Sequence, residues 1–220
     1  MKDVLISWSG GKDSCMALYE IQRSHQYRPP ALVTTITTDY DRVSMHGVRR
    51  VLLEKQAAAL GLPLHKVHIS KDASNQEYET QLIEAVYEYR NRGINSIVFG
   101  DLFLEDIKNY RDQFLSRHDL NGIYPVWLRD TSQFIREFVE LGFNAITTCV
   151  NNEVLDQSFV GKLIDEDFLS ALPSNVDPCG ENGEFHTFVY DGPNFRTPIK
   201  FSTGEKVQRG SFWFCDLVPE

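Results

Sequence analysis

Cysteine is scarce in this chain, and the few cysteines are widely separated. Cys15, Cys149, Cys179 and Cys215 form no C-x-x-C pair. Zinc sites and disulfide frameworks need cysteines at characteristic close spacings, so neither is expected. A reducing compartment fits this usage best, and we therefore expect a cytoplasmic protein.

Long apolar runs and long basic runs are also missing. No stretch is apolar for long enough to cross a bilayer, and residues 1–3 lead directly into a first strand without a signal peptide. The formal net charge is −9. Bulk binding of nucleic acid depends on neutralising phosphates with lysine and arginine, so neither that partner nor a membrane is expected.

Apolar residues make up 42% of the 220 residues, enough for a full core. Short β-branched runs alternate with helical patterns from residue 4 to residue 150, which predicts an α/β fold with a mainly parallel, doubly wound sheet. The tail from residue 188 to 217 reads as strands separated by turns. We expect a first domain over residues 1–115 and a smaller α+β lobe over residues 116–220. The expected strands are residues 4–8, 31–36, 64–69, 96–100, 123–127 and 144–150.

One glycine-containing turn carries the strongest signal. The residues Ser9-Gly10-Gly11-Lys12-Asp13-Ser14, called the glycine loop below, follow the first apolar strand and precede a helix. Glycines allow the backbone to approach a ligand closely, and free N–H groups at a helix start favour an anion. Lys12 adds a positive charge, so the loop predicts a phosphate site. The spacing excludes a Walker A motif, which needs glycine where Ile6 stands and serine or threonine where Asp13 stands. A turn that only begins a helix is the alternative.

Other candidates follow from their position at expected strand ends, where ligands of parallel sheets bind. Asp13 suits a Mg²⁺ site or a helix N-cap. Asp101 follows the fourth strand and suits a metal or a substrate. His46 faces the nucleotide or the acceptor, or is a solvated histidine at a helix start. Glu105 and Arg111 lie on one expected helix, either near the site or as ordinary surface pairs.

The motifs taken in order resemble the diphthine–ammonia ligase family of the PP-loop ATP pyrophosphatases, within the adenine nucleotide alpha hydrolase superfamily. The resemblance covers nearly the whole chain. It implies a HUP-like, Rossmann-type nucleotide domain with a C-terminal lobe, and an AMP-forming ligase that uses ATP and Mg²⁺. A carboxylate on a protein or small molecule would be adenylated, and ammonia would displace AMP. The matching segments are residues 9–14, 45–47, 98–101, 125–127, 159–162 and 180–187.

The resemblance also assigns roles to residues. Lys12, Asp13, Glu184 and His186 would be catalytic, and Asp13 and Asp101 would hold Mg²⁺. Substrate binding would fall to Glu105, Arg111, Glu181, Glu184 and His186. The nucleotide would contact Ser7, Ser9, Gly10, Gly11, Lys12, Asp13, Ser14, Thr37, His46, Gly100 and Asp101.

The segment 180–187 departs from the family pattern. The family usually has glycine where Asn182 stands and an acid where His186 stands. This version looks more like a bacterial branch linked to cobalamin salvage, so amidation of a cobalamin precursor is an alternative to diphthine. We expect Glu181, Glu184 and His186 to face the glycine loop across a cleft, with His186 changing charge near neutral pH. The alternative is a polar turn between two elements.

Two other functions share the glycine loop. A tRNA-modifying PP-loop enzyme would normally need paired reactive cysteines or a basic RNA-binding domain. A non-catalytic sensor of adenine nucleotides would need neither. The sequence leaves the acceptor, the nitrogen source and the oligomeric state open, a homo-oligomer included.

Overall fold

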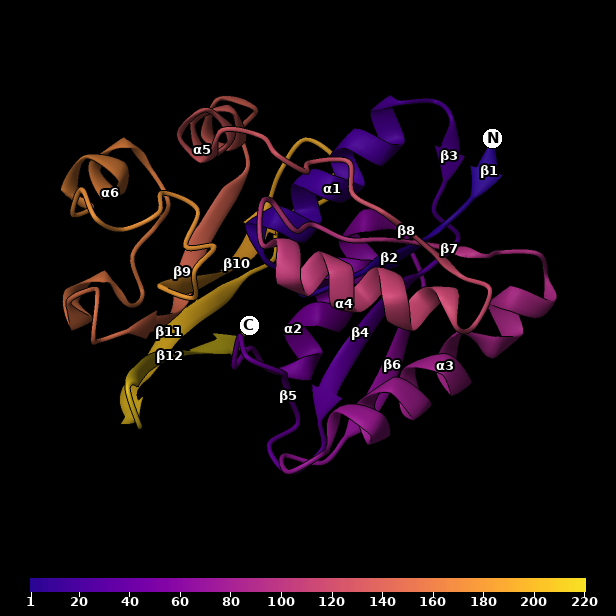
Figure 1. The fold of residues 1–220 in the computed structure, drawn as a ribbon. Helices are drawn as coiled ribbons and strands as arrows, with labels where there is room; N and C mark the ends of the chain where they lie inside the picture. The colour runs from indigo at the N-terminus through magenta and orange to yellow at the C-terminus, as the bar shows by residue number, and fades with distance from the viewer.

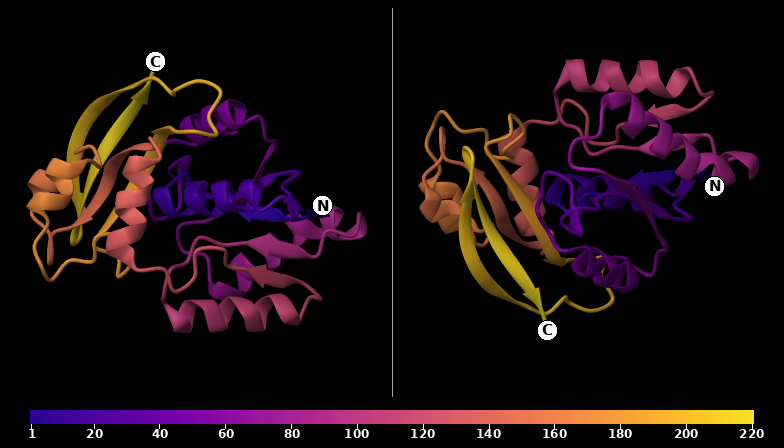
Figure 2. Two further views of the ribbon diagram at one scale, coloured as in Figure 1. Left: turned by 90° about the horizontal axis from the view of Figure 1, so that it is seen from above. Right: turned by 90° about the horizontal axis from the view of Figure 1, so that it is seen from below.

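Two large sheets form the framework of the computed structural model, which describes residues 1–220 (Figure 1). Residues 1–123 hold the first sheet and are called the first half below, and the remaining residues hold the second sheet and are called the second half. The first sheet has six strands and the second has four. The two halves stand side by side in both views of Figure 2. No helix is long and apolar enough to cross a membrane.

The first sheet is mainly parallel, which confirms the predicted α/β class. Its strands run in the order β5-β4-β2-β7-β8, with β6 also paired to β4. Only β5 is antiparallel to its neighbour. A separate pair, β1 (Lys2–Asp3) and β3 (Tyr27–Arg28), is also parallel. The strands of the first sheet are β2 (Leu5–Ser7), β4 (Leu32–Thr37), β5 (Arg42–Val43), β6 (Leu64–Ile69), β7 (Ser96–Val98) and β8 (Asn121–Ile123).

Helices cover both faces of this sheet because alternate strand residues point in opposite directions. Ile6 of β2 packs into the larger apolar cluster, and Leu5 packs into a second, separate one. Helices α1 (Lys12–Arg23) and α2 (Arg50–Leu60) contribute to the larger cluster, whereas α3 (Asn75–Asn91) and α4 (Glu105–Ser116) contribute to the second. The predicted doubly wound arrangement is therefore confirmed.

The second sheet is antiparallel throughout, in the order β10-β9-β12-β11. The prediction that residues 144–150 continue the parallel alternation is wrong, because β9 joins this second sheet. The expected strand over residues 123–127 ends at Ile123, since Pro125 has no N–H to donate and begins a turn. The elements of this half are α5 (Thr131–Glu140), β9 (Asn144–Asn151), η1 (Gln157–Phe159), α6 (Glu166–Ala171), β10 (Phe185–Asp191), β11 (Phe201–Arg209) and β12 (Phe212–Pro219).

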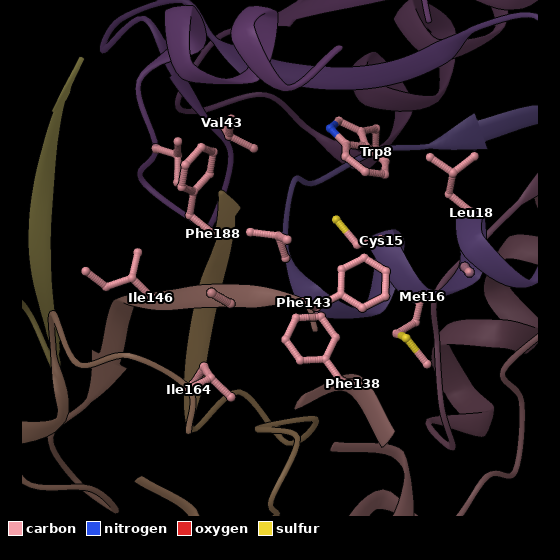
Figure 3. Close-up of a cluster of buried hydrophobic side chains, with 14 of the residues drawn as sticks. Trp8, Cys15, Met16, Leu18, Val43, Phe138, Phe143, Ile146, Ile164 and Phe188 are labelled. Carbon is pink, nitrogen blue, oxygen red and sulfur yellow. The ribbon is translucent and has the colours of Figure 1, made fainter. Parts of the chain in front are cut away.

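The two halves share one core. The larger apolar cluster holds 40 buried residues and joins Met16 and Leu18 of α1 to Phe138, Phe143 and other residues of the second half (Figure 3). The rings of Phe138 and Phe143 stack with centroids 4.9 Å apart. The junction between the halves is therefore a packed apolar interface, and the glycine loop lies beside it. The division at residues 115 and 116 stays a prediction, although β8 beyond it belongs to the first sheet.

Candidate active site

The glycine loop is fixed at Gly10 by the second half of the chain. The carbonyl of Gly10 accepts hydrogen bonds from the Val189 N–H and from Gln56 Nε2, both at 2.9 Å. Gly10 has a φ of 78°, and a Cβ at this residue would lie 2.5 Å from Gln56 Oε1. Glycine is therefore required here both by backbone conformation and by space.

Helix α1 begins inside the glycine loop, at Lys12. Its N-cap residue is Gly11, so no side chain caps the helix start. The Lys12 N–H donates to Thr187 Oγ1 at 3.1 Å, so this amide already has a partner, contrary to the expectation of free amides at the helix start. The Asp13 and Ser14 amides follow in the first turn, where a helix offers no acceptor of its own. The hydroxyls of Ser9 and Ser14 lie 3.2 Å apart beside them. This turn therefore keeps donors for an anion.

Lys12 is nearly enclosed, with 3% of its side chain exposed. Its Nζ donates to Asp13 Oδ2 at 2.9 Å and lies 5.5 Å from the centre of the Phe185 ring. Burial alone would lower the pKa of Lys12, but the negative groups around it, Asp13 first and Glu181 as well, raise that pKa overall. The ammonium group therefore stays charged inside the protein.

Acidic side chains from three segments lie close to one another near the start of α1: Asp13, Asp101 and Glu181. Asp101 follows β7 and forms an ion pair with Arg111 of α4. Glu181 Oε1 accepts from the Leu102 N–H at 2.8 Å. Burial raises the pKa of Asp13 and of Asp101, and burial together with the Asp13 charge raises the pKa of Glu181 to about 7. Glu181 therefore titrates near neutral pH beside the glycine loop.

The carboxylates of Asp13 and Asp101 fit a Mg²⁺ ion whose other ligands would be phosphate oxygens and water. No group of three or more histidine, cysteine or acidic side chains converges on one point. Asp13 Oδ1, however, is buried without a hydrogen-bond partner. Mg²⁺ in nucleotide sites takes one or two carboxylates and completes its shell with phosphate oxygens and water. Asp13 and Asp101 would be those carboxylates.

Two histidines lie over the glycine loop. The rings of His46, in the loop before α2, and His186, in β10, have centroids 4.6 Å apart. Burial lowers the pKa of His46 to about 4 and that of His186 well below its usual range, and the nearby Lys12 charge lowers both further. The expectation that His186 changes charge near neutral pH is therefore wrong, because burial beside a lysine keeps the imidazole neutral.

Glu184 and Glu105, the other two glutamates predicted for the site, are not placed beside Lys12 as Glu181 is. Glu184 is buried, and its Oε1 accepts from the Asp177 N–H and from Asn182 Nδ2, each at 3.1 Å. It holds the 180–187 segment in shape, although its Oε2 is buried without a partner. Glu105 is exposed in the first turn of α4 and makes no ion pair or hydrogen bond through its side chain. The structure brings Glu181 and His186 to the glycine loop but leaves Glu105 outside.

Ser7 and Gly100 lie next to the glycine loop. Ser7 is the last residue of β2, directly before the loop. Gly100 lies against the start of α1, where a Cβ would come 2.6 Å from the backbone carbon of Asp13. Gly100 is therefore needed for close packing against α1, and its contact with the nucleotide stays a prediction.

A pocket of about 340 Å³ opens beyond the end of β4, between the first sheet and the β11–β12 hairpin. Thr37 lines it, and its hydroxyl lies 2.9 Å from the Ser44 hydroxyl. Met45 and Gly47, which flank His46 in the chain, line it too. The complete lining is Thr37, Tyr40, Arg42, Val43, Ser44, Met45, Gly47, Lys71, Val207, Arg209, Phe214, Cys215 and Asp216.

Several residues that shape the site were missed from the sequence. Thr187 holds the Lys12 amide, Gln56 holds Gly10, and Asp216 of β12 pairs with Arg42 and Arg49 at 2.8 and 2.6 Å. All three act across long sequence separations, so no local pattern marks them. Only Thr187 had a signal, since it stands in the 180–187 segment.

The chain matches two domain families in succession. The diphthamide synthase N-terminal domain matches residues 1–121, and the diphthamide synthase C-terminal domain matches residues 130–218. The diphthine--ammonia ligase of Homo sapiens is 28% identical over 232 residues, covering 96% of this chain and 86% of that protein. The enzyme of the same name from Schizosaccharomyces pombe is 26% identical over 229 residues, covering 95% of this chain. This chain spans only 38% of that relative's length.

Among solved structures, the U34-tRNA thiolase NcsA from Methanococcus maripaludis aligns with a TM-score of 0.40 and 17% identity. The alignment covers 64% of this chain and 57% of that one. A likeness this distant supports no argument about activity. The two domain matches, in contrast, cover almost every residue in the expected order. The chain belongs to the diphthamide synthase family.

Proposed function

We propose that this protein is an ATP-dependent ligase that forms a carbon–nitrogen bond. It adenylates a substrate carboxylate with release of pyrophosphate, and then joins ammonia to the activated carbonyl with release of AMP. The observation that carries the proposal is the buried ammonium of Lys12 at the start of α1, paired with Asp13 and close to Glu181. A fixed charge in a site with little water stabilises charge that develops during reaction far better than one in solvent.

The phosphates of ATP bind at the glycine loop in this proposal. The Asp13 and Ser14 amides, the Ser9 and Ser14 hydroxyls and the Lys12 ammonium supply the donors. Lys12 stabilises the negative charge on the leaving pyrophosphate as the bond between the α and β phosphorus atoms breaks. A phosphate oxygen would compete with Thr187 for the Lys12 amide.

We place the adenosine part in the pocket beyond β4. Its volume of about 340 Å³ lies in the range of ligand pockets. Thr37 and Ser44 offer hydroxyls, and Tyr40 and Phe214 offer aromatic surface. The pocket lies at the same edge of the sheet as the glycine loop, as expected for one ligand that spans both.

Mg²⁺, held by Asp13 and Asp101, would offset phosphate charge when bound. Arg111, which pairs with Asp101, and Glu181, which accepts from the Leu102 N–H, are proposed to receive the acceptor. Diphthine is the acceptor in the relatives' name, and it is the first to test here. In this proposal the 1–115 region supplies the phosphate site, the 116–220 region contributes Glu181 to acceptor recognition, and both regions line the adenosine pocket.

Product analysis tests this proposal. Purified protein, ATP, Mg²⁺, ammonium chloride and an elongation factor bearing diphthine should yield AMP and pyrophosphate together with the amide. Lys12→Ala should lower the rate of AMP formation by about 10²–10³-fold, the range for a lost charge-stabilising donor. Lys2→Ala, an exposed lysine in β1, is the matched control and should keep full activity. Formation of ADP and phosphate alone would contradict the proposal.

A further inference from the structure

The rings of His46 and His186 are tilted by 37° to each other, and the tautomer of His46 follows from its contact with the backbone. His46 Nδ1 lies 3.3 Å from the carbonyl oxygen of Thr187. A carbonyl only accepts hydrogen bonds, so Nδ1 carries the proton of the neutral ring. The lone pair of His46 is therefore on Nε2, the nitrogen that faces away from Thr187.

The remaining ring nitrogens of the pair are free and accessible. His46 Nε2 and both ring nitrogens of His186 have no hydrogen-bond partner within the protein. None of them is among the fully buried polar atoms that lack a partner. His46 and His186 are only partly buried, so these nitrogens keep some contact with solvent, from which a very small ligand could reach them.

This space adjoins the glycine loop. A Cβ placed on Gly11 would lie 3.0 Å from His46 Cε1 and 3.1 Å from the Thr187 carbonyl oxygen. Lys12, the next residue, is the charged group that acts on both rings. No carboxylate forms an ion pair with either imidazole, so the pair presents lone pairs and an adjacent positive charge.

Such surroundings discriminate between the two forms of a small nitrogen donor. Ammonium is a cation, and Lys12 repels it. The Asp13 carboxylate pairs with Lys12, and no carboxylate pairs with either imidazole to attract a cation there. Neutral ammonia can donate an N–H to an imidazole lone pair and keep its own lone pair available. The lowered pKa values of both rings agree with this, because neither imidazole is protonated at neutral pH.

We propose that the His46–His186 pair binds the nitrogen donor as neutral ammonia. This inference rests on the proposed ligase function. Ammonia donates one N–H to His46 Nε2, and its lone pair attacks the carbonyl carbon of the adenylated acceptor. The new C–N bond forms, the bond from that carbon to the phosphate oxygen breaks, and AMP leaves with the electron pair. The surplus proton passes to Nε2 and then to water.

The resemblance to the diphthine–ammonia ligase family implies an acid where His186 stands in this chain. A carboxylate in that position would attract ammonium and hold it in an unreactive, protonated form unless a base intervened. An imidazole removes that attraction. His186→Glu should therefore raise the concentration of ammonia needed for half-maximal amide formation, most strongly at low pH.

Two reactions separate this inference from the proposed function. ATP–pyrophosphate exchange with the diphthine-bearing elongation factor needs no ammonia, whereas amide formation does. In His46→Ala and His186→Ala, the KM for ammonia should rise by about 10–100-fold, and exchange should fall far less. His68→Ala, an exposed histidine on β6, is the control and should change neither. The wild-type KM, expressed as total ammonium, should fall about tenfold per pH unit between pH 6.5 and 8.5.

The ligase function and the ammonia site are contradicted by different results. Absence of exchange in the wild-type protein would overturn the ligase function. Normal exchange with an unchanged ammonia KM in both alanine variants would overturn only the ammonia site. Nitrogen NMR of the two labelled histidines adds a readout without turnover: the proposal requires neutral rings at pH 7, a proton on His46 Nδ1, and a shift of Nε2 on adding ammonium chloride. An imidazolium signal at pH 7 would overturn it.

Discussion

The amide of Lys12 donates to the hydroxyl of Thr187 at 3.1 Å, across 175 residues of sequence. This bond joins the glycine loop of the first half to strand β10 of the second. Val189 on the same strand donates to Gly10 at 2.9 Å. The geometry of the loop therefore depends on the second half being in place.

The first prediction concerns this hydrogen bond. Thr187 is 2% exposed, so Thr187→Val leaves the Lys12 amide buried without a partner. The free energy of unfolding should fall by about 1–3 kcal/mol, whereas Thr187→Ser should stay near the wild type. Because a phosphate can take the same amide, ATP with Mg²⁺ should raise the melting temperature more in Thr187→Val than in the wild type. Equal nucleotide-induced shifts would show that this amide does not meet the phosphates.

Glu181 gives a pH-dependent prediction. Its pKa in the folded protein is about 7, above the value near 4.3 of an unfolded chain. The folded state keeps a proton that the unfolded state releases, so this residue's contribution to stability falls as the pH rises from about 4 to 7. Relative to Glu181→Gln, the wild type should lose melting temperature over that range. Glu105→Gln, at an exposed acid, should follow the wild type at every pH.

Asp216 gives a prediction with the opposite sign. Hydrogen bonds from Arg49 and Arg42 lower the pKa of Asp216 to about 2, below its unfolded value. Its stabilisation is therefore complete above about pH 4 and is lost as the pH falls toward 2. At pH 7, Asp216→Asn should lower the free energy of unfolding by about 1–2 kcal/mol, allowing for solvent near Arg49. Asp119→Asn breaks an exposed pair with Arg90, and urea titration should show a change below about 0.5 kcal/mol.

Gly100 tests the packing beneath the loop. A methyl group there would meet the Asp13 carbon at 2.6 Å and the Ser14 nitrogen at 2.8 Å, and neither backbone atom can move without shifting α1. Gly100→Ala should cost about 1–3 kcal/mol of stability and weaken ATP binding. Gly204→Ala is the comparison, because a Cβ there would lie 3.1 Å from a Val218 methyl and 3.3 Å from the Asp216 Cβ, with no backbone atom closer than 3.5 Å. Calorimetry with ATP and Mg²⁺ should find wild-type affinity in that second variant; wild-type affinity in Gly100→Ala as well would refute the packing argument.

The local features of this chain could be predicted from its amino-acid order. Alternating apolar runs specify strands and helices through burial periodicity, and Ser9–Ser14 specifies the turn through glycine conformation and helix-start geometry. Both depend on neighbours within a few residues, so the parallel sheet and the position of the loop could be predicted. The order of motifs was also sufficient for the family.

Contacts between residues far apart in the sequence could be found only in the folded structure. The antiparallel partners of β9, the Thr187 bond to Lys12 and the Asp216 pairs with Arg42 and Arg49 join residues far apart in sequence, which local pattern cannot reveal. The charge of His186 was misjudged for the same reason. Its ionisation depends on burial against His46 and on the field of Lys12, and both exist only once the two halves have packed together.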